Sequence, residues 1–394
     1  MVNGLQPQFQ KYVDAYQQKF PKRKVTLQTL PDDNIQFIQQ LTTERLGDKL
    51  PDITFNVDNS ANRLAAANIT YDISPWLKAG KDGLKGSNFL PQFMGEYTPL
   101  NNPSQITGLP VSADSTALFF DKTLFAKYGV ALPTAGWTWD DMYKAAAQIY
   151  SKSGGKVIGL TAPLQQGGHQ EVYNPVITAE GGYVYDPKTK KSGIGQPAAV
   201  KAWTLMLQAY GSAQPAYSNQ ASAYPQFQTG TVAMTFSVRA TIPTIKSTAT
   251  FKDDWDAAPM PKLNGKTTVG GGSYGLSITS TSKNKDAAWA FLVWFYDNSG
   301  GMKLAQESGQ VLPPTIDGLA NGIWRNAPAP PTNQQIFADD AKEAVLAVQL
   351  PGKAQGVLDS SVITAIQQVE LQHRSVADAF ADAEKAVNAA LSGS

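Results

Sequence analysis

The chain contains no cysteine among its 394 residues. This absence excludes disulfide bonds, thiolate metal sites and a cysteine nucleophile. Histidine is nearly absent too, since only His169 and His373 occur and they lie far apart in the sequence. Two distant histidines do not make a metal site, so we expect neither a metal nor a cofactor.

Charge is scarce and balanced. Only 16% of the residues are charged, whereas about a quarter is usual in soluble domains. The 33 basic and 32 acidic residues nearly cancel, and basic residues gather only in short clusters such as "KRK" at 22–24. We therefore expect no nucleic acid partner, because such partners require a basic surface.

Long apolar runs are missing as well. No run reaches the eighteen or so residues that cross a membrane, and the first twenty residues lack the basic start and apolar middle of a signal peptide. Either the protein is cytoplasmic or a targeting segment is absent from this chain.

The residues that are present indicate an ordered globular chain. Hydrophobic residues make up 42% and aromatic residues 10%, and the length is typical of about two domains. The first third alternates between helix and strand patterns, which favours a mostly parallel sheet flanked by helices. The expected order is helix at 5–20, strand at 25–30, helix at 31–46, strand at 51–55 and helix at 60–68.

The remainder is predicted to be more helical. Thr138 and Asp141 have the spacing of a capping box, and Gly129 is expected to end the preceding helix. The expected elements are helices at 121–129, 138–150, 170–182, 196–210 and 285–297, a hairpin at 183–194, a strand at 231–236 and two polar helices from 339 to the end. The helix at 285–297 is apolar all round and should be buried.

Three Pro- or Gly-containing segments look like connectors: "GLPVSAD", "APMPKLNGK" and "GQVLPPTIDG". Three crossings predict two lobes built from discontinuous pieces of chain, namely 1–112 with 263–310 and 113–262 with 311–394. The hinges are expected near 110–114, 258–262 and 311–316. Two lobes with several hinges usually close around something.

Asp114 raises a question of its own. It lies in "GLPVSADSTALFFDK", residues 108–122, which alternates like a half-buried strand. A buried carboxylate costs several kcal/mol unless it has a partner. That partner could be a backbone amide, a cation, a metal or a ligand.

Seven blocks in chain order carry a family resemblance. They are "PDITF", "ITGLPVSADSTALFFDKTLFAKYGV", "TWDD", "TAEGGYVYD", "FQTGTVAMTF", "WDAAPMPKLNGKTTVGGGSYGLSI" and "KNKDAAWAFLVWFYD". Together they resemble the extracellular solute-binding proteins of carbohydrate ABC importers, the family to which maltose-binding protein belongs. The match runs from about residue 5 to about residue 315 and is weaker through the C-terminal helices.

The resemblance implies an α/β, two-lobe periplasmic-binding-protein-like class II fold with a three-segment hinge. It implies a monomeric receptor, not an enzyme, that holds a mono-, di- or oligosaccharide between its lobes and delivers it to membrane ABC permease subunits. It also implies an extracytoplasmic location, periplasmic or lipid-anchored. Family members normally begin with a strand before the first helix, whereas this chain begins almost at that helix, so a ligand contact from that strand has no counterpart to assign.

The resemblance assigns ligand contacts residue by residue. Asp114 lies where the family places an acidic residue just past the first hinge, and a carboxylate accepts two vicinal hydroxyls at once. Asp58, Asn59 and Ser60 lie where a first-lobe loop touches sugar hydroxyls, although the same residue types also favour a helix N-cap. The residues at 32–34 are expected to be caps rather than ligand contacts.

The second lobe supplies further candidates. His169, Glu171 and Tyr173 match a helix start that carries acidic and aromatic contacts in the family, and His169 is equally compatible with a surface role. Ser237 and Arg239 stand where the family often has a Gly and a Trp, so the usual stacking Trp is lost. Arg239 could donate to hydroxyls or to an anionic group.

The stretch "GGGSYG" at 270–275 formally fits G-x-G-x-x-G, but a strand rather than a helix is expected to follow, which argues against a dinucleotide site. The family resemblance instead assigns Gly271, Gly272, Ser273 and Tyr274 to the ligand, with Tyr274 stacking on a sugar ring. Trp324, expected to be an exposed loop residue, is a further stacking candidate. The other tryptophans singled out, at 137, 139, 289 and 294, are expected in the core.

Two alternatives stay open. A glycoside hydrolase would need two facing carboxylates, and Asp114 with Glu171 could be cast in those roles, but no second motif for hydrolysis is found. A receptor for another solute, such as a polyol, a glycerophosphodiester or a peptide, is kept open by Arg239.

Overall fold

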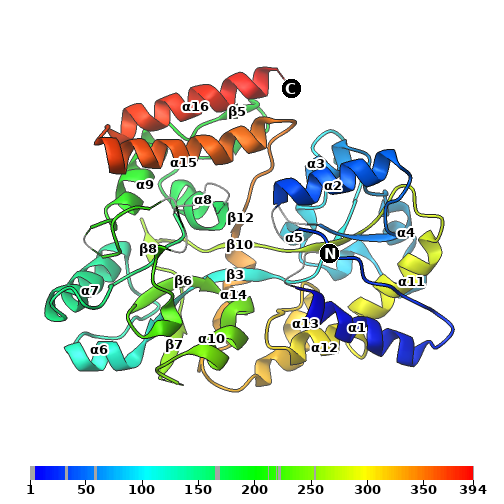
Figure 1. The fold of residues 1–394 in the computed structure, drawn as a ribbon, viewed down its shortest axis with the longest axis horizontal. Helices are drawn as coiled ribbons and strands as arrows, with labels where there is room; N and C mark the ends of the chain where they lie inside the picture. Colours follow the sequence, from blue (N-terminus) through cyan, green and yellow to red (C-terminus); the bar gives the residue numbers. More distant parts are fainter. Residues whose placement is uncertain are drawn as a thin grey trace. The chain divides into compact units, whose positions relative to one another are not determined.

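The computed structural model describes residues 5–31, 34–56, 60–164, 169–211, 213–218, 220, 223–252 and 254–393. The chain divides into two compact units, each made of two stretches of sequence (Figure 1). Unit 1 comprises Met1–Ala113 and Gly272–Arg325, and unit 2 comprises Asp114–Gly271 and Asn326–Ser394. The backbone therefore passes from one unit to the other three times.

Unit 1 is built on a small sheet in the order β1-β11-β2, with antiparallel pairs throughout. The strands are β1 (Ile53–Asn56), β11 (Gly275–Ile278) and β2 (Leu109–Pro110). The helices of unit 1 are α1 (Gln6–Lys19), α2 (Asn34–Leu46), α3 (Ala61–Ala66), α4 (Ser74–Ala79), η3 (Lys81–Gly83), η4 (Gly86–Asn88), α5 (Pro91–Gly95), α11 (Lys285–Tyr296), α12 (Gly301–Glu307), α13 (Ile316–Asn321) and η8 (Ile323–Asn326).

Aromatic side chains fill the core of unit 1. Helix α1 buries Tyr12 and Tyr16, whose rings lie 5.4 Å from Phe295 and 5.0 Å from Phe291 of α11. Such edge-on aromatic pairs add to the stabilisation from apolar burial. The predicted amphipathic helix at 5–20 and the predicted buried helix at 285–297 are both confirmed.

Unit 2 contains a five-stranded sheet in the order β12-β10-β3-β6, with β7 also pairing with β3. Its strands are β3 (Asp114–Asp121), β6 (Met234–Val238), β7 (Trp255–Ala258), β10 (Gly270–Gly272) and β12 (Val345–Leu346). Two hairpins are formed by β4 (Tyr185–Asp186) with β5 (Lys191–Ser192) and by β8 (Lys262–Leu263) with β9 (Lys266–Thr267). The hairpin predicted at 183–194 is thus confirmed.

Helices surround this sheet. They are α6 (Lys122–Tyr128), α7 (Trp139–Lys152), α8 (Gln170–Ala179), α9 (Pro197–Leu207), η6 (Phe227–Thr229), η7 (Arg239–Thr241), α10 (Ile242–Thr248), α14 (Gln335–Glu343), α15 (Ala354–Gln372) and α16 (Val376–Ser392). The two predicted C-terminal helices are α15 and α16, and they are less polar than expected because each buries one face, including Leu358 and Phe380.

Local sequence signals fix several helix ends as predicted. The hydroxyl of Thr138 accepts from the backbone N–H of Asp141, and the carboxylate of Asp141 accepts from the backbone N–H of Thr138 at 3.0 Å, which completes the capping box. Gly129 ends α6 at φ 58°, a left-handed conformation that favours glycine.

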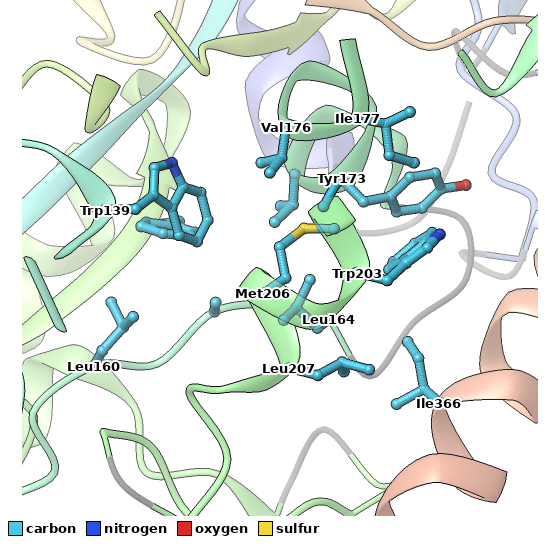
Figure 2. Packing of buried hydrophobic residues seen from close by; sticks show 14 of the residues in the cluster. Trp139, Leu160, Leu164, Tyr173, Val176, Ile177, Trp203, Met206, Leu207 and Ile366 are labelled. Atoms are coloured by element: carbon cyan, nitrogen blue, oxygen red, sulfur yellow. The ribbon is translucent and has the colours of Figure 1, made fainter. Parts of the chain in front are cut away.

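The core of unit 2 centres on the ring of Trp203. It stacks on Phe380 of α16 at 4.3 Å and lies 5.0 Å from the ring of Tyr173 on α8. Figure 2 shows Tyr173 and Trp203 side by side, with Met206 and Val176 packed close to them. The C-terminal helix is therefore part of this core rather than an appendage.

Two predictions about strands are wrong. Residues 25–29 form no strand, and only Leu30 makes an isolated bridge, although 25–30 alternates like a strand. The sheets are not mostly parallel, since the β1–β11, β11–β2, β3–β6 and β3–β7 pairs are antiparallel and β10–β12 is parallel. A parallel sheet requires consecutive βα units to pair, whereas here Ile53 pairs with Ile278, far along the chain.

The second and third crossings lie further along the chain than the expected hinges. Residues up to Gly271 stay with unit 2 because the indole of Trp139 donates to Thr268 Oγ1 at 3.1 Å and β10 pairs with β12. Residues after Val311 stay with unit 1 because the carbonyl of Leu312 accepts from the N–H of Ala113 at 2.9 Å. The first crossing, after Ala113, lies within the expected range.

Candidate functional site

Strand β10 brings together two of the predicted site segments. A Cβ atom at Gly270 would lie 1.8 Å from the carbonyl oxygen of Glu171, and one at Gly271 would lie 2.5 Å from the carbonyl oxygen of Asp114. Side chains are therefore excluded at both positions. The two glycines therefore let the protein's own backbone come close to β10. The approaching segments are the first residue of β3, Asp114, and the first turn of α8, which contains Glu171.

Asp114 begins β3 and is half-buried. The opposite charge that acts on it is that of Arg239. Arg239 follows β6 and comes close to Asp114 because Thr116 of β3 pairs with Val238 of β6. Burial lowers the pKa of Arg239 to about 10, and the charge of Asp114 opposes that shift. Arg239 is thus a cation at neutral pH, and it supplies one of the partners that a carboxylate in this strand requires.

Arg239 itself is only 1% exposed. Its Nη1 atom donates to Oε1 of Gln334, and its guanidinium carbon lies 5.8 Å from the centre of the Phe337 ring on α14. The buried cation therefore has contacts within unit 2. Its predicted role as a donor to a ligand stays a prediction.

His169 and Glu171 form a polar pair at the start of α8. His169 precedes the helix, its Nδ1 atom pairs with Oε1 of Glu171, and the two side chains are 33% and 29% exposed. A carboxylate in the first turn is favoured by the positive end of the helix dipole. These two predicted contacts thus remain accessible to a solute.

The aromatic candidates on α8 and after α13 are buried instead. Tyr173 belongs to the core around Trp203, and burial raises its pKa. Trp324 is 1% exposed and its indole donates to the carbonyl of Gly318 at 3.1 Å, so the expectation that Trp324 is exposed is wrong. Large aromatic rings find more apolar contact inside a core than at a surface, which accounts for the burial of both residues. Their predicted contacts with a ligand stay predictions.

Tyr274 is the accessible aromatic candidate. Its side chain is 42% exposed, and its ring lies 4.9 Å from Phe55 of β1. The preceding Ser273 is buried, and its Oγ atom accepts from the N–H of Ser112 at 3.2 Å while its carbonyl accepts from the hydroxyl of Tyr97 at 2.7 Å. Ser273 holds the segment in place, and Tyr274 presents its ring.

The remaining candidates of unit 1 divide into two groups. Ser60 is buried and is the N-cap residue of α3, as the alternative expectation had it, although its side chain makes no capping hydrogen bond to that helix. Asp58 and Asn59 lie outside the described residues, as do the expected caps at 32 and 33. Gly272 ends β10 and is part-exposed.

Ser237 lies on the wall of a pocket that sequence reasoning missed. The pocket has a volume of about 320 Å³ and lies wholly within unit 2. Other lining residues include Thr161, Gln226, Gln228 and Thr241. No motif marks these residues, because four separate segments of the chain supply the walls and only the tertiary fold assembles them. No motif marks Gln334 and Phe337 either, because only the tertiary fold brings them into contact with Arg239.

Two features are missing from the described residues. No cluster of histidine and acidic side chains there is arranged to hold a metal ion. None of the helices in those stretches combines the length and the apolar character that a membrane span requires.

Several solved structures share this architecture. The ABC substrate-binding protein from Listeria monocytogenes in complex with cycloalternan is 21% identical, with a TM-score of 0.84 over 98% of this chain and 96% of that one. The solute-binding protein from Thermotoga lettingae bound with α-D-tagatose is 19% identical, with a TM-score of 0.82 over 98% and 96%. UgpB from Mycobacterium tuberculosis in complex with glycerophosphocholine is 17% identical, with a TM-score of 0.82 over 98% and 95%.

These likenesses establish the mixed α/β fold of periplasmic solute-binding proteins, as the sequence resemblance predicted. The sequence itself matches the family described as bacterial extracellular solute-binding protein over residues 3–302, which is about three quarters of the chain. The protein therefore belongs to the family of bacterial extracellular solute-binding proteins.

Proposed function

We propose that this protein is a carbohydrate receptor that captures a mono-, di- or oligosaccharide. The observation that carries the proposal is the grouping around β10. The backbone carbonyls of Asp114 and Glu171 approach this strand, and both residues are part-exposed. The exposed ring of Tyr274 lies two residues beyond the end of the strand.

The chemistry of a sugar matches this set of groups. Carboxylates are strong hydrogen-bond acceptors, and a sugar presents vicinal hydroxyl donors that one carboxylate can accept together. The C–H face of a pyranose ring packs well on an aromatic ring such as that of Tyr274. Substrate-binding proteins of similar fold whose solved structures hold cycloalternan and tagatose support the same substrate class.

The transport role follows from family membership. We propose that the loaded receptor acts outside the cytoplasm, periplasmic or lipid-anchored, and hands its solute to the permease of an ABC importer. In this role the receptor is monomeric and releases its solute chemically unchanged, so a glycoside hydrolase is not favoured.

A second candidate solute is a glycerophosphodiester. Two observations favour it, namely the similarity to a complex with glycerophosphocholine and the presence of Arg239. The weight of the second observation is reduced because Arg239 is buried against Gln334 and Phe337 and is balanced by the charge of Asp114.

A thermal-shift screen tests the proposal. The panel contains mono-, di- and oligosaccharides, polyols and glycerophosphocholine, and the reaction mixtures are afterwards examined for cleavage products. A solute present at a hundred times its Kd stabilises the folded state by about 2.7 kcal/mol, which raises the melting temperature by several degrees. A shift with glycerophosphocholine and with no sugar would refute the carbohydrate proposal, and cleavage products would support the hydrolase.

A further inference from the structure

The pocket of unit 2 has walls from four segments. Its floor combines β6 with the neighbouring segment around Thr161, which pair in parallel through Thr161 and Thr235. The start of α10 and the segment 224–228 form the other walls. The pocket is therefore a feature of one folded unit.

Hydroxyl groups cover the floor in two pairs. Thr161 Oγ1 donates to Thr235 Oγ1 at 3.0 Å, and Ser237 Oγ lies 2.8 Å from Thr241 Oγ1. All four side chains are part-exposed and line the pocket. Thr235 Oγ1 also donates to the carbonyl of Thr161, and Thr241 Oγ1 donates to that of Val238, so the four hydroxyls offer a solute mainly acceptor lone pairs. Gln226 and Gln228 add amide groups, each of which can both donate and accept.

None of the described residues that line the pocket carries a charge. The cations nearest in sequence are Lys246 and Arg239, and neither lines the pocket. Lys246 donates to the carbonyl of Pro328, and Arg239 donates to Gln334. An anion placed here would lose its hydration without gaining a countercharge, which costs several kcal/mol. A neutral solute with many hydroxyls would exchange its water contacts for the hydroxyl and amide groups of the walls at little net cost.

The volume of the pocket bears on the size of the solute. About 320 Å³ corresponds to roughly ten water molecules at about 30 Å³ each. That space is large enough for a sugar ring with its hydroxyls. Apolar surface from Phe227 and Ile245 lies beside the polar floor, and a sugar ring has both kinds of surface.

We propose that this pocket holds one uncharged sugar ring of the transported solute and makes the receptor select neutral polyhydroxyl solutes over anionic ones. The inference rests on the proposed function and goes further, because it assigns a site within unit 2 and decides between the sugar and the glycerophosphodiester.

Isothermal titration calorimetry on the full chain tests the pocket. The probes are glucose, galactose, mannose, xylose, tagatose and maltose, with glucose 6-phosphate as an anionic counterpart and glycerophosphocholine as the phosphodiester. The double variant T161V/T235V removes both partners of one hydroxyl pair at nearly constant shape, which limits its effect on folding. Q228A is a second, independent pocket variant, and T248V on the same helix α10 is the matched control because Thr248 does not line the pocket.

We expect the wild type and T248V to bind at least one neutral sugar with equal affinity and to bind glucose 6-phosphate at least a hundredfold more weakly than glucose. T161V/T235V and Q228A should each raise the Kd for that sugar at least tenfold. If both variants bind the sugar as tightly as the wild type, the pocket assignment is overturned while the proposed function stands. If the wild type binds no sugar in the panel, the proposed function fails and takes the pocket assignment with it. Tight binding of either phosphorylated probe would overturn the selection of neutral solutes.

Discussion

Asp340 offers a prediction whose size follows from the structure. It lies on α14, the helix that also carries Phe337 beside Arg239. The Oδ2 atom of Asp340 is buried and has no hydrogen-bond partner among the residues that the structure describes. Burial, together with the charges of Asp339 and Glu343, raises the pKa of Asp340 from 3.8 to about 7.

The raised pKa means that the folded state binds the proton of Asp340 more tightly than the unfolded state does. The stabilisation is therefore fully present below the unfolded pKa of 3.8 and is lost as the pH rises from 3.8 to about 7. The two pKa values differ by about three pH units, and at ~1.4 kcal/mol each the limit is about 4 kcal/mol. Between pH 4.5 and pH 8 we expect this residue to lower the free energy of unfolding by roughly 2–3 kcal/mol.

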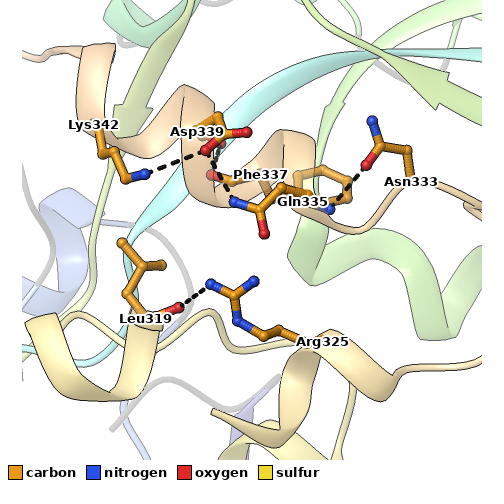
Figure 3. Close-up of polar contacts among 8 residues, drawn as sticks. Leu319, Arg325, Asn333, Gln335, Phe337, Asp339 and Lys342 are labelled. Atoms are coloured by element: carbon orange, nitrogen blue, oxygen red, sulfur yellow. Dashed lines mark hydrogen bonds and ion pairs between the residues drawn. The ribbon is translucent and has the colours of Figure 1, made fainter. Parts of the chain in front are cut away.

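The variant D340N removes this titration and keeps the shape of the side chain. Urea unfolding followed by circular dichroism should show D340N close to the wild type at pH 4.5 and more stable by roughly 2–3 kcal/mol at pH 8. The comparison variant is D339N on the same helix, whose side chain is 60% exposed. It removes a charge that contributes less than burial to the raised pKa of Asp340, so its gain in stability at pH 8 should be much smaller than that of D340N. Figure 3 shows Asp339 accepting from Gln335 and Lys342. An exposed pair of this kind contributes less than about 1 kcal/mol. If D340N and the wild type differ by the same amount at both pH values, the reasoning about the buried carboxyl is refuted.

Three further predictions concern the site and its framework. Replacing Asp114 by Ala should weaken sugar binding by roughly 1.5–3 kcal/mol in calorimetry, because an ionised acceptor is lost, and unchanged affinity would return Asp114 to a purely structural role beside Arg239. Replacing Tyr274 by Ala should cost about 0.5–1.5 kcal/mol of affinity and leave urea unfolding nearly unchanged, since the ring is 42% exposed; a large loss of stability instead would show that the ring serves packing. Replacing Thr138 by Ala should lower the free energy of unfolding by about 1 kcal/mol through loss of the cap on α7, with sugar affinity as the readout that must stay constant.

Part of the candidate site could be predicted from the sequence. Asp114, Glu171 and Tyr274 were singled out by their place in a family pattern, and the structure leaves each of them accessible to solvent in part or more. Trp324 shows the limit of that reasoning. A tryptophan in a Pro- and Gly-containing loop reads as exposed, yet its burial depends on whether distant segments cover it, which the local sequence does not encode.

The sequence by itself determined the local elements. Helix ends such as Thr138 and Gly129 depend on hydrogen bonds and backbone angles within a few residues, and the buried helix at 285–297 follows from its composition. The scarcity of charge and the absence of cysteine restricted the chemistry in the same direct way.

Only the tertiary structure decided what depends on contacts between distant parts of the chain. The antiparallel pairing of β1 with β11 and the neighbourhood of Asp114 and Arg239 each join segments more than a hundred residues apart. The uncharged pocket beside Ser237 joins residues 161–163 to segments within 224–245. Periodicity reports which face of an element is apolar, but it does not report which other element covers that face. The partner of Asp114 was therefore an open question in the sequence, and the fold supplied a buried cation, Arg239, from the turn that follows the neighbouring strand β6.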